Sequence, residues 1–81
     1  MDETIRLSEL GVGQGGRVRE IRAAGGIRRR LMDIGLLRGG RVECVGKSPA
    51  GDPAAYLIRG AVIAIRAQDA KKILLLREEE A

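Results

Sequence analysis

The stretch GGRVECVGKSPAGDPAAYLIRGAVIAIR, residues 39–66, decides the fold of this chain. Its two leading glycines make a turn, after which residues 41–47 alternate in polarity. Val42 and Cys44 point to one face, and the charged side chains of this segment point to the other. Because a period of two is typical of a half-buried strand, the first part of the stretch predicts a β-strand.

The remainder of the stretch predicts a loop and two further strands. Residues 48–53 contain two prolines, which lack the amide proton that a sheet residue donates, so this segment is expected to be a loop. Segments 54–59 and 61–66 are mainly apolar, and Gly60 between them permits a tight reversal. Two strands joined by so short a turn pair antiparallel.

Two more strands are predicted outside this stretch. Residues 17–22 follow a glycine-rich loop, although their apolar members are three apart and fit a period of two imperfectly. Residues 73–77 are almost continuously apolar. We also expect an extended arm at residues 4–7, a single helical turn capped by Ser8, and a second single turn at residues 68–72.

A short helix is predicted over residues 27–34. Its apolar residues at i, i+4 and i+7 form one stripe: Ile27, Leu31 and Ile34. Gly35 ends the helix, because glycine adopts the left-handed conformation without steric cost. Leu36 then lies where a Schellman motif places a hydrophobic contact, against Leu31.

The chain is therefore expected to be one mainly-β domain, residues 1–81. Five short antiparallel strands, with one short helix after the first of them and helical turns near both ends, would curl into a small barrel that leaves no exposed sheet edge. Its core has to be aliphatic, since the chain has no Phe, no Trp and one Tyr.

Residue types needed for catalysis are missing. The chain has no histidine, so no imidazole can act as general base for a hydroxyl or thiol nucleophile. Its paired carboxylates lie at the two ends, where the burial that raises a catalytic pKa is hard to arrange. Asp52 is interpreted as a turn residue. We therefore expect no enzyme and no catalytic residue.

The same composition argues against a resident metal or cofactor. A transition-metal site needs imidazole or thiolate ligands that converge from several positions, and one cysteine without any histidine cannot provide them. Cys44, in the middle of a predicted strand, is expected to be a small buried hydrophobe.

The net charge of +4 leaves two interpretations open: a solvated surface, or a surface for an anionic partner. Arg28, Arg29 and Arg30 could neutralise phosphates, but base-stacking aromatics are missing apart from Tyr56, which argues against nucleic acid. No stretch approaches the roughly 18 apolar residues that a spanning helix needs, and the first residues are acidic. We expect a cytoplasmic protein without membrane insertion.

The spacing of residues along the whole chain resembles the FeoA family (ferrous iron transport protein A). The core of the resemblance is RLMDIGL, residues 30–36, followed by Gly39, Val42 and Val45. Further matches are Leu7 to Leu10 with Gly15, the loop 49–53, Gly60, residues 63–66, Ala70, Ile73 and Leu75. One departure is Arg38, where the family often has proline.

The resemblance implies an SH3-like barrel, a cytoplasmic location and no catalysis. It also implies a partner, the FeoB-type membrane transporter, whose GTP-binding domain faces the cytosol. The expected function is that of an accessory protein that binds this cytosolic region and modulates ferrous iron uptake. The alternative is a regulatory or nucleic-acid-associated module related to the C-terminal domain of iron-dependent repressors. The family's association with transition metals finds no ligand set in these residues, and weak self-association stays open.

A contact surface for such a partner should combine an exposed apolar spot with surrounding charges. The first candidates are on and after the predicted helix: Arg28, Arg29, Arg30, Leu36 and Leu37. The second candidates are in the proline-containing loop: Pro49, Asp52 and Pro53.

Overall fold

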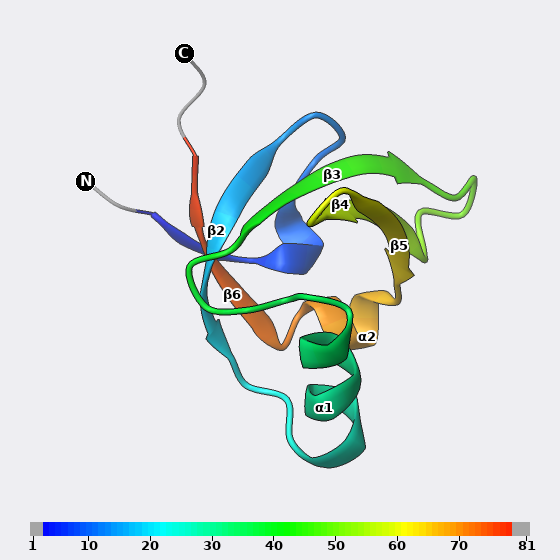
Figure 1. Ribbon diagram of the computed structural model, residues 1–81. Helices are drawn as coiled ribbons and strands as arrows, with labels where there is room; N and C mark the ends of the chain where they lie inside the picture. Colours follow the sequence, from blue (N-terminus) through cyan, green and yellow to red (C-terminus); the bar gives the residue numbers. More distant parts are fainter. Residues whose placement is uncertain (1–2, 79–81) are drawn as a thin grey trace.

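The computed structural model describes residues 3–78, which form one curled antiparallel sheet with two short helices (Figure 1). The strands follow one another in space in the order β1-β6-β2-β3-β4-β5. Their bounds are β1 Thr4–Arg6, β2 Gly15–Ile21, β3 Arg41–Lys47, β4 Ala54–Ile58, β5 Ala61–Ile65 and β6 Ile73–Arg77. The described range excludes residues 1–2 and 79–81. These residues include most of the terminal carboxylates, for which no catalytic role is expected. The predicted mainly-β class is confirmed.

All five predicted strands are present, and the N-terminal arm is a sixth. In β1, Ile5 lies opposite Leu75 of β6, so the arm extends the sheet. The predicted arm is extended, as expected, but it was not counted among the five strands because three residues are too few for a pattern. The neighbouring β6 supplies the hydrogen-bond partners that make it a strand. The structure also explains why the apolar residues of β2 fit a period of two imperfectly. The register of β2 against β6 shifts between Val18 and Glu20. Such a bulge places Val18 and Ile21 on the same side.

The sheet keeps two edges, β1 and β5, because these strands stand at the two ends of the order and do not pair with each other. The expectation that barrel closure removes every exposed edge was therefore wrong for the described residues. The strands curl toward one another, as Figure 1 shows, but the ladder of backbone hydrogen bonds is not continuous around the barrel.

Helix α1 spans Gly25–Asp33 and ends as its sequence predicts. Gly35 has a φ of 99°, its amide donates to the Met32 carbonyl at 3.0 Å, and the Leu36 amide donates to the Leu31 carbonyl at 3.0 Å. These two bonds make a Schellman motif, and the buried Leu31 and Leu36 side chains supply its hydrophobic contact. The helix starts two residues earlier than predicted.

The two helical turns are formed differently from the sequence prediction. In the 3₁₀ turn η1 (Leu7–Glu9), the Glu9 carboxylate accepts a hydrogen bond from the Arg6 amide at 2.6 Å, so Ser8 is not the cap. Helix α2 spans Ala67–Ala70, and its first amide donates to Asp52 Oδ1 at 2.8 Å. A side chain from the distant loop thus satisfies an amide that the helix itself leaves free.

The core is aliphatic around a single aromatic ring. Tyr56 of β4 is 2% exposed, and its hydroxyl donates to the Leu7 carbonyl at 3.5 Å. Val42 and Cys44 of β3 are both buried, as their alternation predicts, and the Cys44 thiol is free. The other large and fully buried side chains are Leu7, Leu10, Leu36, Ile58, Ile73 and Leu75.

We expect the native protein to lose stability in strong alkali through Tyr56. Burial of the phenol, with smaller contributions from Cys44 and Asp52, raises the pKa of Tyr56 to about 12. Because the unfolded chain releases this proton near pH 10, the contribution is fully present below pH 10 and is lost as the pH rises toward 12, by roughly 3 kcal/mol. Tyrosinate absorbance measures this single group directly, and a native midpoint near that of free tyrosine would contradict the burial.

Candidate functional site

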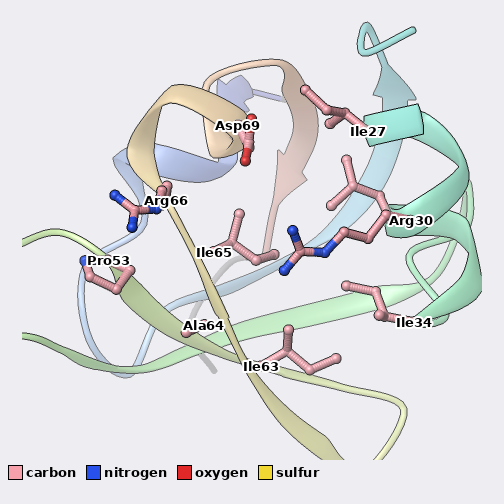
Figure 2. Close-up of a pocket in the computed structure, with 10 residues that line it drawn as sticks. Ile27, Arg30, Ile34, Pro53, Ile63, Ala64, Ile65, Arg66 and Asp69 are labelled. Carbon is pink, nitrogen blue, oxygen red and sulfur yellow. The ribbon is translucent and has the colours of Figure 1, made fainter. Parts of the chain in front are cut away.

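Two hollows flank helix α1, one on each side. The first, here called the α1–β5 groove, lies between α1, β5 and α2 and has a volume of about 300 Å³ (Figure 2). The second, here called the arginine hollow, lies between α1, β2 and the segment after α1 and has a volume of about 530 Å³. Its cationic members are Arg19, Arg28 and Arg38.

The helical period divides the predicted arginine cluster between these hollows. Successive residues on an α-helix point about 100° apart, so three neighbouring arginines cannot form one patch. Arg28 lines the arginine hollow, and Arg30 lines the α1–β5 groove. Arg29 lies with Arg28 and Met32 in a shallower depression on the outer face of α1. The three arginines thus do not share one hollow: Arg28 and Arg29 lie together in this depression, and Arg30 faces the α1–β5 groove.

The arginine hollow combines positive charge with exposed apolar surface. The Arg28 guanidinium donates to the Ile21 carbonyl at 2.8 Å, which fixes it at the rim. Met32 is 43% exposed and Leu37 is 41% exposed, and both line the same hollow. Leu37 and Arg28, two of the predicted contact residues, therefore lie together in one mixed apolar and basic hollow. Their contact with a partner stays a prediction. Sequence reasoning missed Met32, although it follows Arg28 by four residues on the same helix face.

The only carboxylate among the lining residues of this hollow, Glu20, is neutralised locally. Its hydrogen bond and ion pair with Arg22 lower the pKa of the Glu20 carboxyl, and the nearby charges of Arg19 and Arg38 act in the same direction. Glu20 is thus ionised at neutral pH, and Arg22 compensates its charge. The three remaining cations of the hollow leave its field positive.

Leu36 does not belong to an exposed contact surface, which corrects the prediction. Its side chain is only 1% exposed. The reason is the Schellman motif, which turns this residue back against Leu31 and into the core. The sequence pattern correctly predicted the contact between Leu36 and Leu31. Because this contact buries the Leu36 side chain, the same side chain is not available to a partner protein.

The three candidates in the loop also separate. Pro53 lines the α1–β5 groove, and Asp52 accepts the hydrogen bond that starts α2. Pro49 is exposed and lines neither of the two hollows. Within the described residues, Asp52 therefore has a structural role that its interpretation as a turn residue did not foresee.

The α1–β5 groove has aliphatic walls and charged groups at its opening. Ile27 and Ile34 of α1 face Ile63 and Ile65 of β5, as Figure 2 shows. The Arg30 side chain extends from α1 into the space between these walls. At the α2 end, Asp69 has one carboxylate oxygen, Oδ1, that is buried and accepts no hydrogen bond within residues 3–78.

Neither hollow presents a set of metal ligands. Across residues 3–78, no group of three or more His, Cys, Asp or Glu side chains comes together. In the same range no helix has both the length and the apolar character needed to cross a membrane. What the two hollows offer is aliphatic surface, arginine side chains and one unsatisfied carboxylate oxygen, which is chemistry for binding.

Comparison with known proteins agrees with this architecture. The FeoA domain family model matches residues 5–77. The Fe(2+) transport protein A/Fe(2+) transporter FeoB fusion protein of Porphyromonas gingivalis is 32% identical over 69 residues, which cover 85% of this chain and 8% of that protein. This chain thus spans only a small part of that relative.

Solved structures show the same fold. The FeoA-like protein of Clostridium acetobutylicum is 34% identical, with a TM-score of 0.88 over 100% of this chain and 94% of that one. Stenotrophomonas maltophilia FeoA, described as a procaryotic SH3 domain protein and solved with zinc, is 27% identical, with a TM-score of 0.80 over 95% and 99%. A manganese-dependent transcriptional repressor, 18% identical with a TM-score of 0.84 over 96% of this chain and 44% of that one, shares the fold alone. The fold is SH3-like, and the chain belongs to the FeoA domain family.

Proposed function

We propose that this protein is a non-catalytic accessory of a ferrous iron uptake system and binds the cytosolic region of a FeoB-type transporter. The observation that carries the proposal is the fusion protein of P. gingivalis, in which a domain similar to this chain and a transporter share one polypeptide. Fusion keeps two modules at high effective concentration, which favours a pair that works in contact. A separate protein would have the same function by binding the transporter from the cytoplasm.

The arginine hollow is the surface that we assign to this contact. It offers Met32 and Leu37 as exposed apolar side chains inside a positive rim. A partner surface with carboxylates around an apolar projection complements it. Since no aromatic residue is available as a buried anchor, we expect micromolar binding, about −8 kcal/mol, that weakens as salt is added.

Charge reversal in the arginine hollow tests this surface. The double variant Arg28→Glu with Arg38→Glu should weaken binding to the cytosolic GTP-binding domain of a FeoB-type transporter by more than about tenfold, because it replaces attraction by repulsion. Isothermal titration at low salt measures the affinity. The matched control is Lys71→Glu with Lys72→Glu, which changes the net charge equally but lies on the segment after α2, outside both hollows.

Two outcomes would contradict the proposal. If the double arginine variant and the lysine control bind equally well, the arginine hollow is not the contact surface. If the native protein binds labelled DNA or RNA tightly at physiological salt but not the transporter domain, a nucleic-acid-associated function replaces the proposed one. The likeness to the manganese-dependent repressor concerns the fold and does not favour that alternative.

A further inference from the structure

Strand β5 presents an open edge along the α1–β5 groove. It is the last strand of the sheet and, among the described strands, pairs only with β4, in a regular register from Ile58 opposite Ala61 to Ala54 opposite Ile65. The two residues that join these strands, Arg59 and Gly60, have φ values of 51° and 82°. Positive φ at both positions is the geometry of a type I′ hairpin turn, whose flanking pair exchanges two backbone hydrogen bonds.

The hairpin geometry determines which backbone groups of β5 are free. Hydrogen-bonded and non-hydrogen-bonded pairs alternate along an antiparallel ladder. Because Ala61 belongs to the bonded pair next to the turn, Ile63 and Ile65 also bond to β4. The amide and carbonyl groups of Val62 and Ala64 therefore point away from the sheet, toward the open edge.

This edge lacks the features by which edge strands usually avoid pairing. Natural edges are protected by charged side chains, proline, bulges or very short length. β5 is the uncharged five-residue sequence AVIAI without proline, and its register with β4 has no shift. Val62 is 63% exposed. The opposite edge, β1, has only three residues. Among the described strands, β5 is thus the edge best suited to accept another strand.

The groove beside this edge has room and chemistry for such a strand. An added strand lies about 4.8 Å from its neighbour. Ile34 on α1 and Ile63 on β5 offer apolar contacts to its side chains. Arg30 extends into the groove and Arg66 follows the end of β5, and neither forms an ion pair within the described residues. Asp69 also lines the groove, and its buried Oδ1 accepts no hydrogen bond within the described residues.

We propose that the open edge of β5 binds an extended, acidic segment of a partner chain as an added strand. Its backbone pairs with Val62 and Ala64, its apolar side chains contact the isoleucines of the groove, and its carboxylates face Arg30 and Arg66. The inference rests on the proposed function, because we assign this segment to the cytosolic region of the FeoB-type transporter. Two arginines against one carboxylate make the charge of the groove complementary to an acidic segment.

A second copy of this chain fits the edge less well. Two β5 strands paired antiparallel about Ile63 would bring Arg66 of each copy close to Arg59 of the other, which places like charges at both ends of the pair. A free extended segment does not bring these like charges together.

The first experiment removes one outward-pointing amide. Ala64→Pro deletes the Ala64 N–H without removing a hydrogen bond to β4, a position at which edge strands tolerate proline. We expect the affinity for the transporter's cytosolic region to fall by about tenfold or more. Ala64→Val is the matched control, since it keeps the amide and suits a strand, and it should bind as the native protein does. Thermal unfolding of both variants checks that the fold is retained.

The second experiment observes the edge directly. Amide hydrogen exchange of Val62 and Ala64 should slow when the transporter's cytosolic region is added, while the Arg28→Glu, Arg38→Glu variant reports separately on the arginine hollow. Binding that leaves exchange at both amides unchanged would overturn the added strand and leave the proposed function standing. If the protein forms a stable dimer that the Ala64→Pro variant does not form, a second copy of the chain is the occupant. That result would also overturn the proposed strand from a partner protein.

A short peptide tests strand addition at the β5 edge separately from the proposed binding to the transporter. If the transporter's cytosolic region does not bind at all, the proposed function fails, and a synthetic peptide of alternating valine and glutamate tests the edge alone. Slower exchange at Val62 and Ala64 with this peptide, and not with a valine and lysine peptide, would support the acidic strand. No change with the valine and glutamate peptide, or equal changes with both peptides, would overturn it.

Discussion

Replacing Tyr56 with alanine is expected to lower the free energy of unfolding by about 3–5 kcal/mol, as large-to-small changes of buried aromatic residues do. Tyr56 is the chain's single aromatic residue and is 2% exposed in the centre of the core. No other large ring can move into the space that it leaves. Since a domain of this size has a total stability of about 4–12 kcal/mol, urea titration should show a large part of it lost.

The matched change is Tyr56→Phe, which keeps the ring and removes the hydroxyl. The hydrogen bond to the Leu7 carbonyl is long, at 3.5 Å, so we expect this variant to lose no more than about 1 kcal/mol. Equal losses for the alanine and phenylalanine variants would mean that the hydrogen bond, and not the packing of the ring, stabilises the core.

A methyl group at position 16 is expected to cost about 1–3 kcal/mol, the usual range for overpacking. The Cβ atom of Gly16→Ala would lie 2.6 Å from the Leu76 carbonyl oxygen and 3.3 Å from its carbon. These are backbone atoms of β6, which cannot rotate away as a side chain can, so the pairing of β2 with β6 has to open. Denaturant titration measures the loss.

Gly46→Ala is the control within a strand of the same sheet. A Cβ atom at Gly46 would have no neighbour within 4 Å. This substitution should be neutral or slightly stabilising, because alanine restricts the unfolded chain more than glycine does. A loss at position 46 as large as that at position 16 would show that the cost comes from backbone freedom and not from contact with β6.

The two proposed contact surfaces differ in their chemistry. The arginine hollow offers apolar side chains within a positive field, and the open edge of β5 offers unpaired backbone groups. Neither mode needs catalysis or a metal. Their variants act on different residues, so binding measurements on Arg28→Glu, Arg38→Glu and on Ala64→Pro assign the contribution of each surface separately.

The sequence by itself determined the elements that depend on neighbouring residues. The strand at 41–47 follows from alternation, and the end of α1 follows from Gly35 and Leu36. The buried state of Cys44 follows from its position in that strand. In each case the decisive interaction joins residues a few positions apart, so the local pattern contains the cause.

Only the tertiary structure decided the features that depend on distant segments. Three residues at Thr4–Arg6 became a strand because β6 lies beside them, and Asp52 became a helix cap because the loop meets α2. The helical period spreads the arginines of α1 around the helix, but which hollow each one lines was decided by β2 and β5, which lie on opposite sides of that helix. The open edge of β5 likewise exists because the curled sheet does not close. No local pattern contains the partner that such contacts require, so the site appeared only when the chain was folded.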